Sequence, residues 1–529
     1  MLQKAPSGAF FVGEGTRRGW QPLRPRQDPP ASARTLGGMN TAATPTPPIP
    51  DAPDAITALD ATALSEAIHA RQLSCREVMQ AYLARIDRLN PTYNALVSLR
   101  PAEALLAEAD ACDAELARGQ SRGWLHGVPQ AIKDLSNVAG MPTSLGSPLM
   151  KDFVAHEDGL MAARMKAAGC IVIGKSNTPE FGLGSHTFNE VFGATRNAYA
   201  PGRTAGGSSG GAAVALALRL LPVADGSDFM GSLRNPAAWA NGFGLRPSQG
   251  RVPMVPALDV WVSQLGTEGP MGRSVRDVAR LLETQAGWSP NAPLSIAGRA
   301  DPTGSGDALD VKTQRIGWLG DLNGYLPMEG GILARCEDGL QRLQGLGCTV
   351  EPATLGMAPE RVWKAWLIWR RVLVASRVAP FLLKAGNRAL IKPEALWEHD
   401  QAEGCSAADF LSASVTRTQF YQSMLALFDQ YDFLALPTAQ VWPFAVEERW
   451  PQSVAGKPMD TYHRWMEVVI YATFAGLPCI NVPVGFSPEG LPMGMQLIGR
   501  PQDDAGVLRL AAAYEQVIGD WLGRLPGAV

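Results

Sequence analysis

Apolar and polar positions along the chain repeat with the period of an α-helix in its first ordered stretch. Between Asp60 and Leu89 the apolar residues recur every three or four positions, which is the spacing of one helical face. Ser74 followed three residues later by Glu77 is a capping-box pattern, so a helix should begin there and end at Pro91. This stretch therefore predicts two helices.

Beyond Pro91, short apolar runs bounded by glycine alternate with helical stretches. This order predicts an α/β fold in which one central sheet of mixed direction is covered by helices on both faces. The expected helices are 159–168, 211–219 and 507–517, and the expected strands are 127–132, 170–173, 220–224, 316–319, 433–436, 480–484 and 493–498.

Two segments depart from this alternation. Residues 1–58 are rich in Pro, Arg, Ala and Thr and lack apolar periodicity, so we expect a disordered tail ahead of a domain at 59–529. Arg17 and Arg18 resemble a twin-arginine signal, but no apolar run follows them, and both Met1 and Met39 are possible starts.

Residues 357–430 are mostly helical in pattern and predict an inserted helical cap. Trp363, Trp366 and Trp369 lie near one face of that helix, where core packing is favoured over a role as a substrate wall.

Composition narrows the class of partner. The 47 basic and 50 acidic residues give a net charge of −3, which provides no basic field for a nucleic acid or an anionic membrane. No apolar run reaches the roughly 18 to 20 residues that a spanning helix needs. The seven cysteines form no CxxC pair, which disfavours a zinc site or a secreted disulfide framework. We therefore expect a cytoplasmic enzyme that acts on a small molecule, with a homodimer as one possible assembly.

Two glycine- and serine-rich segments are the strongest candidates for chemistry. They are Gly206–Gly211 (GGSSGG) and, after an apolar helix, Asp225–Pro236 (DGSDFMGSLRNP). Glycines allow close backbone approach and expose amides that can bind a developing oxyanion. A flexible linker is disfavoured because an apolar helix follows the first segment directly.

Three mechanisms can be compared for these segments. The first segment matches G-x-S-x-G, but residues 197–204 before it have a loop pattern where a nucleophile elbow needs a strand. A phosphate-binding loop lacks its Lys-Ser/Thr pair, because Gly210 is followed by Gly211 and Ala212. The six histidines form no metal-binding pair, and a histidine base stays open but without support.

The third mechanism uses Lys133, which ends the short apolar run of GVPQAIKDL. A solvated lysine is not expected there, so burial is predicted. A lysine can serve as a base only if its pKa falls from about 10.4 towards 7, which costs roughly 4 kcal/mol and requires desolvation or nearby donors and cations. Serine hydroxyls could relay the proton.

These motifs together resemble the amidase signature family. GVPxxxKD, GGSSGG and GSDxxGSLRxP occur in the family's order, with 75 residues from Lys133 to Ser208 and 24 from Ser208 to Ser232. Weaker resemblances extend over residues 61–522. The resemblance implies the amidase-signature α/β fold.

The resemblance also implies a Ser-cisSer-Lys triad without metal or cofactor. Ser232 would attack the amide carbonyl, Ser208 would bridge the proton, and Lys133 would accept it. The Gly207–Ser208 peptide would be cis. The oxyanion hole would consist of the backbone amides of Phe229, Met230, Gly231 and Ser232.

Some positions near this triad are specific to this chain. Met230 stands where most of the family has glycine, so a side chain should reshape the pocket. Phe181, Gly182 and Trp442 are expected at the substrate pocket, with an apolar or aryl acyl group as the substrate. Asp228 and Arg234 are expected to pair and hold the loop.

The predicted function is hydrolysis of a carboxylic amide to an acid and ammonia or an amine through a seryl acyl-enzyme. The alternative is the glutaminase subunit of a tRNA-dependent amidotransferase. A binding protein that keeps only the fold is disfavoured because Lys133, Ser208 and Ser232 are all intact.

Overall fold

The computed structural model describes residues 54–297 and 310–527. Most of the expected tail, residues 1–53, lies outside the described residues. Its last residues are ordered, because a helix occupies Ala55–Ala58 and the Asp54 side chain accepts a hydrogen bond from the Thr57 amide at 2.7 Å. This helix lies just ahead of residue 59, where the sequence pattern placed the start of the domain.

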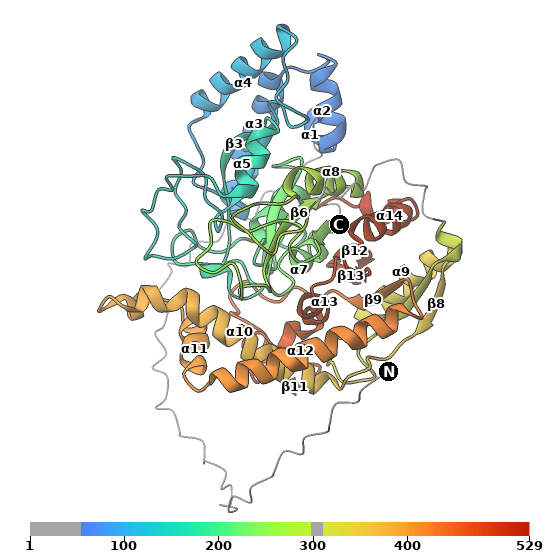
Figure 1. The fold of residues 1–529 in the computed structure, drawn as a ribbon. Coiled ribbons are helices and arrows are strands. Elements are labelled where there is room, and N and C mark those ends of the chain that lie inside the picture. The colour runs from blue at the N-terminus through green and yellow to red at the C-terminus, as the bar shows by residue number, and fades with distance from the viewer. Residues whose placement is uncertain (1–53, 298–309, 528–529) are drawn as a thin grey trace, which may run out of the picture. The chain divides into compact units, whose positions relative to one another are not determined.

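The α/β fold predicted from the sequence is confirmed (Figure 1). The α-helices are α1 (Ala55–Ala58), α2 (Ala61–His69), α3 (Cys75–Tyr93), α4 (Ala102–Ala117), α5 (Leu160–Ala167), α6 (Gly210–Ala217), α7 (Arg234–Ala238), α8 (Val275–Gln285), α9 (Ile332–Gly345), α10 (Pro359–Leu382), α11 (Pro393–Ala402), α12 (Ala407–Phe428), α13 (Ile470–Ala475), α14 (Asp504–Glu515) and α15 (Gly519–Leu522). The strands are β1 (Leu96–Val97), β2 (Pro129–Lys133), β3 (Ile171–Ser176), β4 (Ala224–Asp228), β5 (Phe243–Arg246), β6 (Thr267–Gly272), β7 (Arg315–Trp318), β8 (Thr349–Pro352), β9 (Phe433–Pro437), β10 (Ser453–Val454), β11 (Lys457–Pro458), β12 (Cys479–Phe486) and β13 (Pro492–Ile498).

The central sheet has eight strands in the order β4-β6-β5-β12-β13-β9-β7-β8. Its pairs are antiparallel from β4 to β9 and parallel from β9 to β8, so its direction is mixed as expected. Residues alternate between the faces of a strand. A side chain at Gly494 on β13 would meet α7, whereas its neighbour Met495 lies beside Gly339 of α9. Helices therefore cover both faces.

The structure differs from the single sheet that was expected. β1, β3 and β2 form a separate three-stranded sheet. β2 lies next to β4, but side chains take the place of a main-chain ladder at this junction. The Lys133 amide donates to the Asp225 carboxylate at 3.1 Å, and Gln130 Nε2 donates to the Val223 carbonyl at 2.6 Å. These side-chain bonds join the two sheets.

Two local predictions were wrong. α3 has the expected capping box but continues past Pro91 to Tyr93. The Asn94 amide still bonds the Asn90 carbonyl at 2.7 Å, and the left-handed conformation of Asn94 (φ 50°) then ends the helix. The strand expected at 220–224 begins only at Ala224 and continues to Asp228. Leu220 and Leu221 are buried, but their amides bond the Ala215 carbonyl, so they complete the end of α6.

The segment 357–430 contains α10, α11 and α12, and α10 packs against both of the others (Figure 1). Trp363, Trp366 and Trp369 are buried in the main hydrophobic core, as core packing predicts. Within the described part of the chain, no helix is long and apolar enough to cross a membrane.

Candidate active site

Lys133 is the last residue of β2, and its side chain is 1% exposed. Its Nζ lies 2.8 Å from Ser208 Oγ, 2.8 Å from Ser209 Oγ and 3.1 Å from Ser227 Oγ. A neutral amine has two N–H donors and one lone pair, so it can donate to two of these hydroxyls and accept from the third. The contacts suit an uncharged lysine.

Burial lowers the pKa of Lys133 to about 7, although Asp225, Asp228 and Glu268 act in the opposite direction. Serine hydroxyls stabilise an ammonium ion less than a carboxylate contact would, so desolvation of the charged form dominates. The lysine is therefore available as a base near neutral pH, which is the condition that the sequence set for it.

The Ser208 loop leads directly into α6, and its Gly207–Ser208 peptide is cis. Ser185 holds the loop from both sides of Gly207: its Oγ donates to the Gly207 carbonyl at 2.7 Å and accepts from the Gly207 amide at 3.2 Å. At Gly211 the backbone passes so close to Asn177 that a Cβ would lie 2.3 Å from the Asn177 nitrogen. Only glycine fits at that position.

A second loop follows β4 and carries Ser232. The Asp228 carboxylate accepts from Arg234 Nε at 2.9 Å and Nη2 at 3.0 Å, which is the expected pair. Burial alone would raise the pKa of Asp228, but Arg234, Arg246 and the Gly231 amide lower it to about 2. The Ser209 amide donates to the Ser232 carbonyl at 3.2 Å and ties the two serine loops together.

One of the four expected oxyanion amides has a hydrogen-bond partner within its own loop. The Gly231 amide donates to Asp228 Oδ1 at 2.8 Å, so it is already satisfied inside the loop. Gly231 has φ +80°, and this conformation turns its amide towards the carboxylate. Among the described residues, no main-chain hydrogen bond uses the amides of Phe229, Met230 or Ser232. Three of the four amides therefore remain free.

Ser208, Ser227 and Ser232 line one cavity of about 350 Å³. Within the described residues no hydrogen bond joins Ser208 to Ser232. The two serines share this cavity, and their loops are joined by the hydrogen bond from the Ser209 amide to the Ser232 carbonyl. The apolar part of its wall comes from several elements and consists of Leu135, Leu145, Phe181, Leu183, Phe229, Met230, Met254, Val255, Pro256, Leu258, Val374, Val378, Phe381 and Met466.

Two of the three residues expected at the substrate pocket line the cavity, and the third does not. Phe181 and Gly182 line the cavity, and a Cβ on Gly182 would lie 3.6 Å from Ser208 Oγ. Trp442 does not line it: its Nε1 donates to the Gly330 carbonyl at 3.1 Å and its amide to Glu329 at 2.7 Å. The loop after β9 follows Glu329 and its neighbours, a direction that the sequence pattern does not specify.

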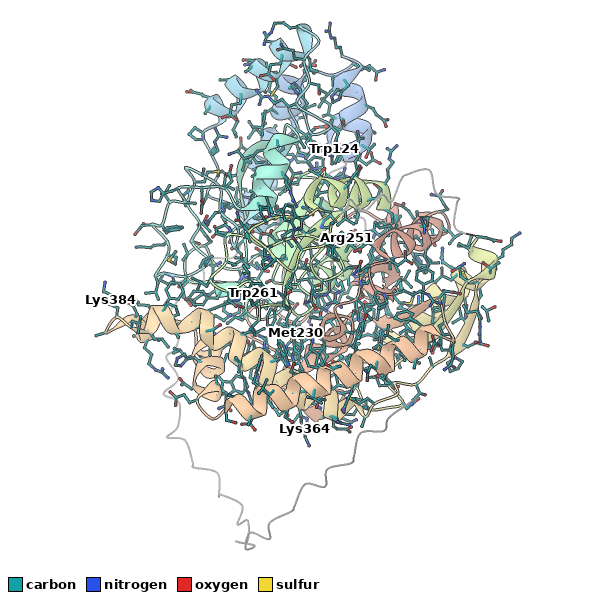
Figure 2. The ribbon with its side chains drawn as sticks, in the orientation of Figure 1. Trp124, Met230, Arg251, Trp261, Lys364 and Lys384 are labelled. Carbon is teal, nitrogen blue, oxygen red and sulfur yellow. The ribbon has the colours of Figure 1, made fainter. Side chains whose placement is uncertain are left out.

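Met230, which is labelled in Figure 2, lines the cavity, and a residue of α10 also contacts its side chain. Arg370 Nη1 on α10 lies 3.6 Å from Met230 Sδ, and the same guanidinium pairs with Glu398 and donates to Tyr462 Oη at 2.6 Å. The helical segment therefore contacts the Ser232 loop through Arg370, which forms a buried ion pair with Glu398 within that segment.

Several cavity residues were missed from the sequence. Val374, Val378 and Phe381 come from α10 at spacings of four and three residues, the pattern of one helical face. That spacing could have indicated an apolar face of the helix, but not that this face lines the active-site cavity. Glu268 of β6 carried no signal, because it stands alone between small and polar residues.

Cys112, Glu115 and His126 are one of two groups, among the described residues, whose possible metal-ligating atoms lie within 4.8 Å of one another. His126 Nδ1 accepts from the Arg122 amide at 3.1 Å, and Nε2 bonds the Cys112 carbonyl at 3.0 Å. Both ring nitrogens are therefore engaged, and Glu115 pairs with Arg122.

Comparison with known sequences places this site in a family. The family model described as Amidase matches residues 77–508. The chain is 32% identical over 463 residues to an acylamidase of Rhodococcus erythropolis, covering 87% of this chain and 95% of that protein. It is 33% identical over 492 residues to a glutamyl-tRNA(Gln) amidotransferase subunit of Symbiobacterium thermophilum, covering 87% and 96%.

Solved structures agree with the sequences. A bacterial aryl acylamidase of the amidase signature enzymes superposes with a TM-score of 0.82 at 29% identity, covering 89% of this chain and 98% of that one. A 6-aminohexanoate cyclic dimer hydrolase in complex with its substrate superposes with a TM-score of 0.77 at 25% identity, covering 89% and 100%. The chain therefore belongs to the amidase signature family and is a hydrolase that acts on carbon–nitrogen amide bonds.

Proposed function

We propose that the protein cleaves small carboxylic amides through an acyl-enzyme on Ser232, with Ser208 and Lys133 as its proton relay. One observation carries this proposal: Lys133 Nζ lies 2.8 Å from Ser208 Oγ beside a cavity that Ser232 also lines. The lowered pKa of Lys133, about 7 because of burial, supports the role of a base at neutral pH.

The first half-reaction forms the acyl-enzyme. Ser232 Oγ bonds the amide carbonyl carbon while its proton passes to Ser208 Oγ, and the Ser208 proton passes to the lone pair of Lys133 Nζ. The carbonyl oxygen becomes an oxyanion near the free amides of Phe229, Met230 and Ser232, where removal of one essential donor typically costs about 3 to 4 kcal/mol. The relay then returns a proton to the leaving nitrogen, and the carbon–nitrogen bond breaks.

The second half-reaction releases the acid. Water enters, gives its proton to the same relay, and attacks the acyl carbonyl, so that Ser232 leaves and recovers its hydrogen. No step in this scheme requires another reactant, because the proton that Lys133 accepts in each attack is returned in each collapse.

The cavity favours an apolar acyl or aryl group. Its volume of about 350 Å³ suits a small molecule, and Phe181, Phe229 and the α10 face contribute apolar walls. Two relatives, an acylamidase and an aryl acylamidase, agree by name with this substrate class.

The alternative is a glutaminase subunit, which the 33% identity to the Symbiobacterium amidotransferase protein favours. The apolar walls fit glutamine less well, because its charged amino and carboxylate groups would need polar partners. Glutaminase activity that appears only when partner subunits are added would support this alternative.

Labelling with a fluorophosphonate, followed by peptide mass spectrometry, tests the proposal. We expect one adduct on Ser232, none in Ser232→Ala, and full labelling in Ser453→Ala, which alters an exposed serine on β10. An adduct on any other residue would remove Ser232 from its role. Lys133→Ala should lose orders of magnitude in kcat while it remains folded, and near-normal turnover would refute the relay.

A further inference from the structure

Glu268 is a buried acid in the active-site cavity that the proposed relay does not use. It belongs to β6, is 6% exposed, and lines the same cavity as Ser208 and Ser232. One of its carboxyl oxygens accepts a hydrogen bond from Ser136 Oγ. Buried carboxyl groups usually pair with a cation, but no ion pair of Glu268 is present among the described residues.

The strand register places Glu268 beside the lysine. Ser227 of β4 stands opposite Glu268 of β6 in an antiparallel pair. Side chains of opposite residues lie on one face of the sheet, with Cβ atoms about 5 Å apart. Ser227 Oγ in turn lies 3.1 Å from Lys133 Nζ. The Glu268 side chain is therefore only one serine away from the amine.

The other charged groups around Lys133 are already engaged. From β4, Asp228 pairs with Arg234 and Arg246, and Asp225 accepts the main-chain amide of Lys133 at 3.1 Å. From β3, Lys175 lies 3.9 Å from Asp134 and donates to the Ser136 carbonyl at 2.5 Å. Asp225 also has no ion pair among the described residues, but its carboxylate is held by the main-chain amide of Lys133, whereas the Glu268 carboxyl is held by Ser136 alone.

The acids and the lysine titrate in one range. Burial raises the pKa of Glu268 to about 7 and that of Asp225 to about 6, while it lowers the pKa of Lys133 to about 7. Groups that interact at this distance share their protons, so the charge on Glu268 affects the proton on Lys133.

We propose that Glu268 is a positioning residue for the proton of Lys133: its negative charge, across Ser227, keeps the buried amine basic enough to draw the proton from Ser208. The inference rests on the proposed relay. Desolvation alone would leave the lysine a weaker base, and an uncharged residue at position 268 would not correct this.

The sign of the expected effect follows from the charge. A negative group near an amine favours its protonated form and raises its pKa, so Glu268→Gln lowers the pKa of Lys133. The acidic limb of the activity profile then moves to lower pH, by on the order of one pH unit for charges this close. The plateau falls at the same time, because the weaker base removes the proton less effectively.

The rate of fluorophosphonate labelling at Ser232, measured from pH 5 to 9, tests this without a known substrate. The full chain, Glu268→Gln and a control, Glu515→Gln, are compared. Glu515 is also a carboxyl whose pKa burial raises to about 7, but it accepts the Val275 amide at the start of α8. We expect the limb to move to lower pH and the plateau to fall in Glu268→Gln alone.

Two outcomes overturn the inference: a limb at the same pH in Glu268→Gln and the full chain, or an equal displacement in Glu515→Gln. If Glu268→Gln does not fold, Glu268→Asp keeps the charge and should keep the limb near its original pH, and a limb displaced to lower pH there would also refute the role. Failure of the relay itself gives a different result, because the full chain would then not be labelled at Ser232 at all.

Discussion

Replacing Lys133 by methionine should remove activity and change how stability depends on pH. Methionine keeps an unbranched apolar chain in the same space but cannot hold a proton. Lowering the pKa of a lysine from 10.5 to about 7 corresponds to about 4 to 5 kcal/mol of folding free energy at low pH. This cost exists because the unfolded lysine is solvated and protonated, whereas the folded lysine is buried.

The sign follows from proton binding. Between pH 7 and 10.5 the unfolded chain binds more protons at this residue than the folded chain, so the stability of the unsubstituted protein rises with pH in that window. From pH 7 to pH 9 the lysine cost should fall by about 2 kcal/mol. In Lys133→Met the three serine hydroxyls lose their hydrogen bonds to the amine, and each lost bond costs about 1 kcal/mol of stability. That cost does not depend on pH, so it cancels in the comparison.

Guanidinium unfolding of both proteins at pH 7 and pH 9 measures this difference. At pH 7 the relief of the lysine cost slightly exceeds the loss at the hydroxyls, so Lys133→Met should be about as stable as the unsubstituted protein or about 1 kcal/mol more stable. Between pH 7 and pH 9 this difference should shift by about 2 kcal/mol against the variant, so that at pH 9 Lys133→Met is about 1 kcal/mol less stable than the unsubstituted protein. Lys364→Met alters an exposed lysine of α10 and serves as the control (Figure 2). An equal stability difference at the two pH values would show that Lys133 is not kept neutral by burial.

Other substitutions test the two loops and the cavity. Asp228→Asn leaves the buried Arg234 without its charge partner and should cost about 3 to 5 kcal/mol, seen as a lower unfolding midpoint; an unchanged midpoint would contradict the role of this ion pair. Met230→Gly removes the contact with Arg370 and enlarges the cavity, so kcat/KM should rise for bulky acyl p-nitroanilides relative to the acetyl compound; a uniform change across the series would show that Met230 does not limit acyl size. Gly182→Ala places a side chain at φ +70°, with its Cβ 2.7 Å from Leu135 Cδ1, and should cost about 1 to 2 kcal/mol and lower kcat; wild-type values of both would refute the close packing beside Ser208.

Much of the fold was predictable because its signals are local. The capping box at Ser74, the helix after the GGSSGG loop and most of the central strands follow from spacing within a few residues. The errors occur where longer contacts override a local signal. α3 ends at Asn94, whose side chain donates to the distant Phe192 carbonyl at 2.7 Å, and β4 starts late because the apolar end of α6 is buried in the core.

The sequence by itself determined the order and spacing of the residues predicted to do the chemistry, which are Lys133 after an apolar run and Ser208 and Ser232 in glycine-rich segments. Only the tertiary structure decided which groups meet. It engages the Gly231 amide with Asp228, removes Trp442 from the cavity, and places Glu268 opposite Ser227. The physical reason is that residue types fix donors, acceptors and local backbone, whereas desolvation and the distances between segments far apart in the chain arise only from packing. The basicity of Lys133 depends on both sequence and tertiary structure, because the residue type provides the amine and burial lowers its pKa.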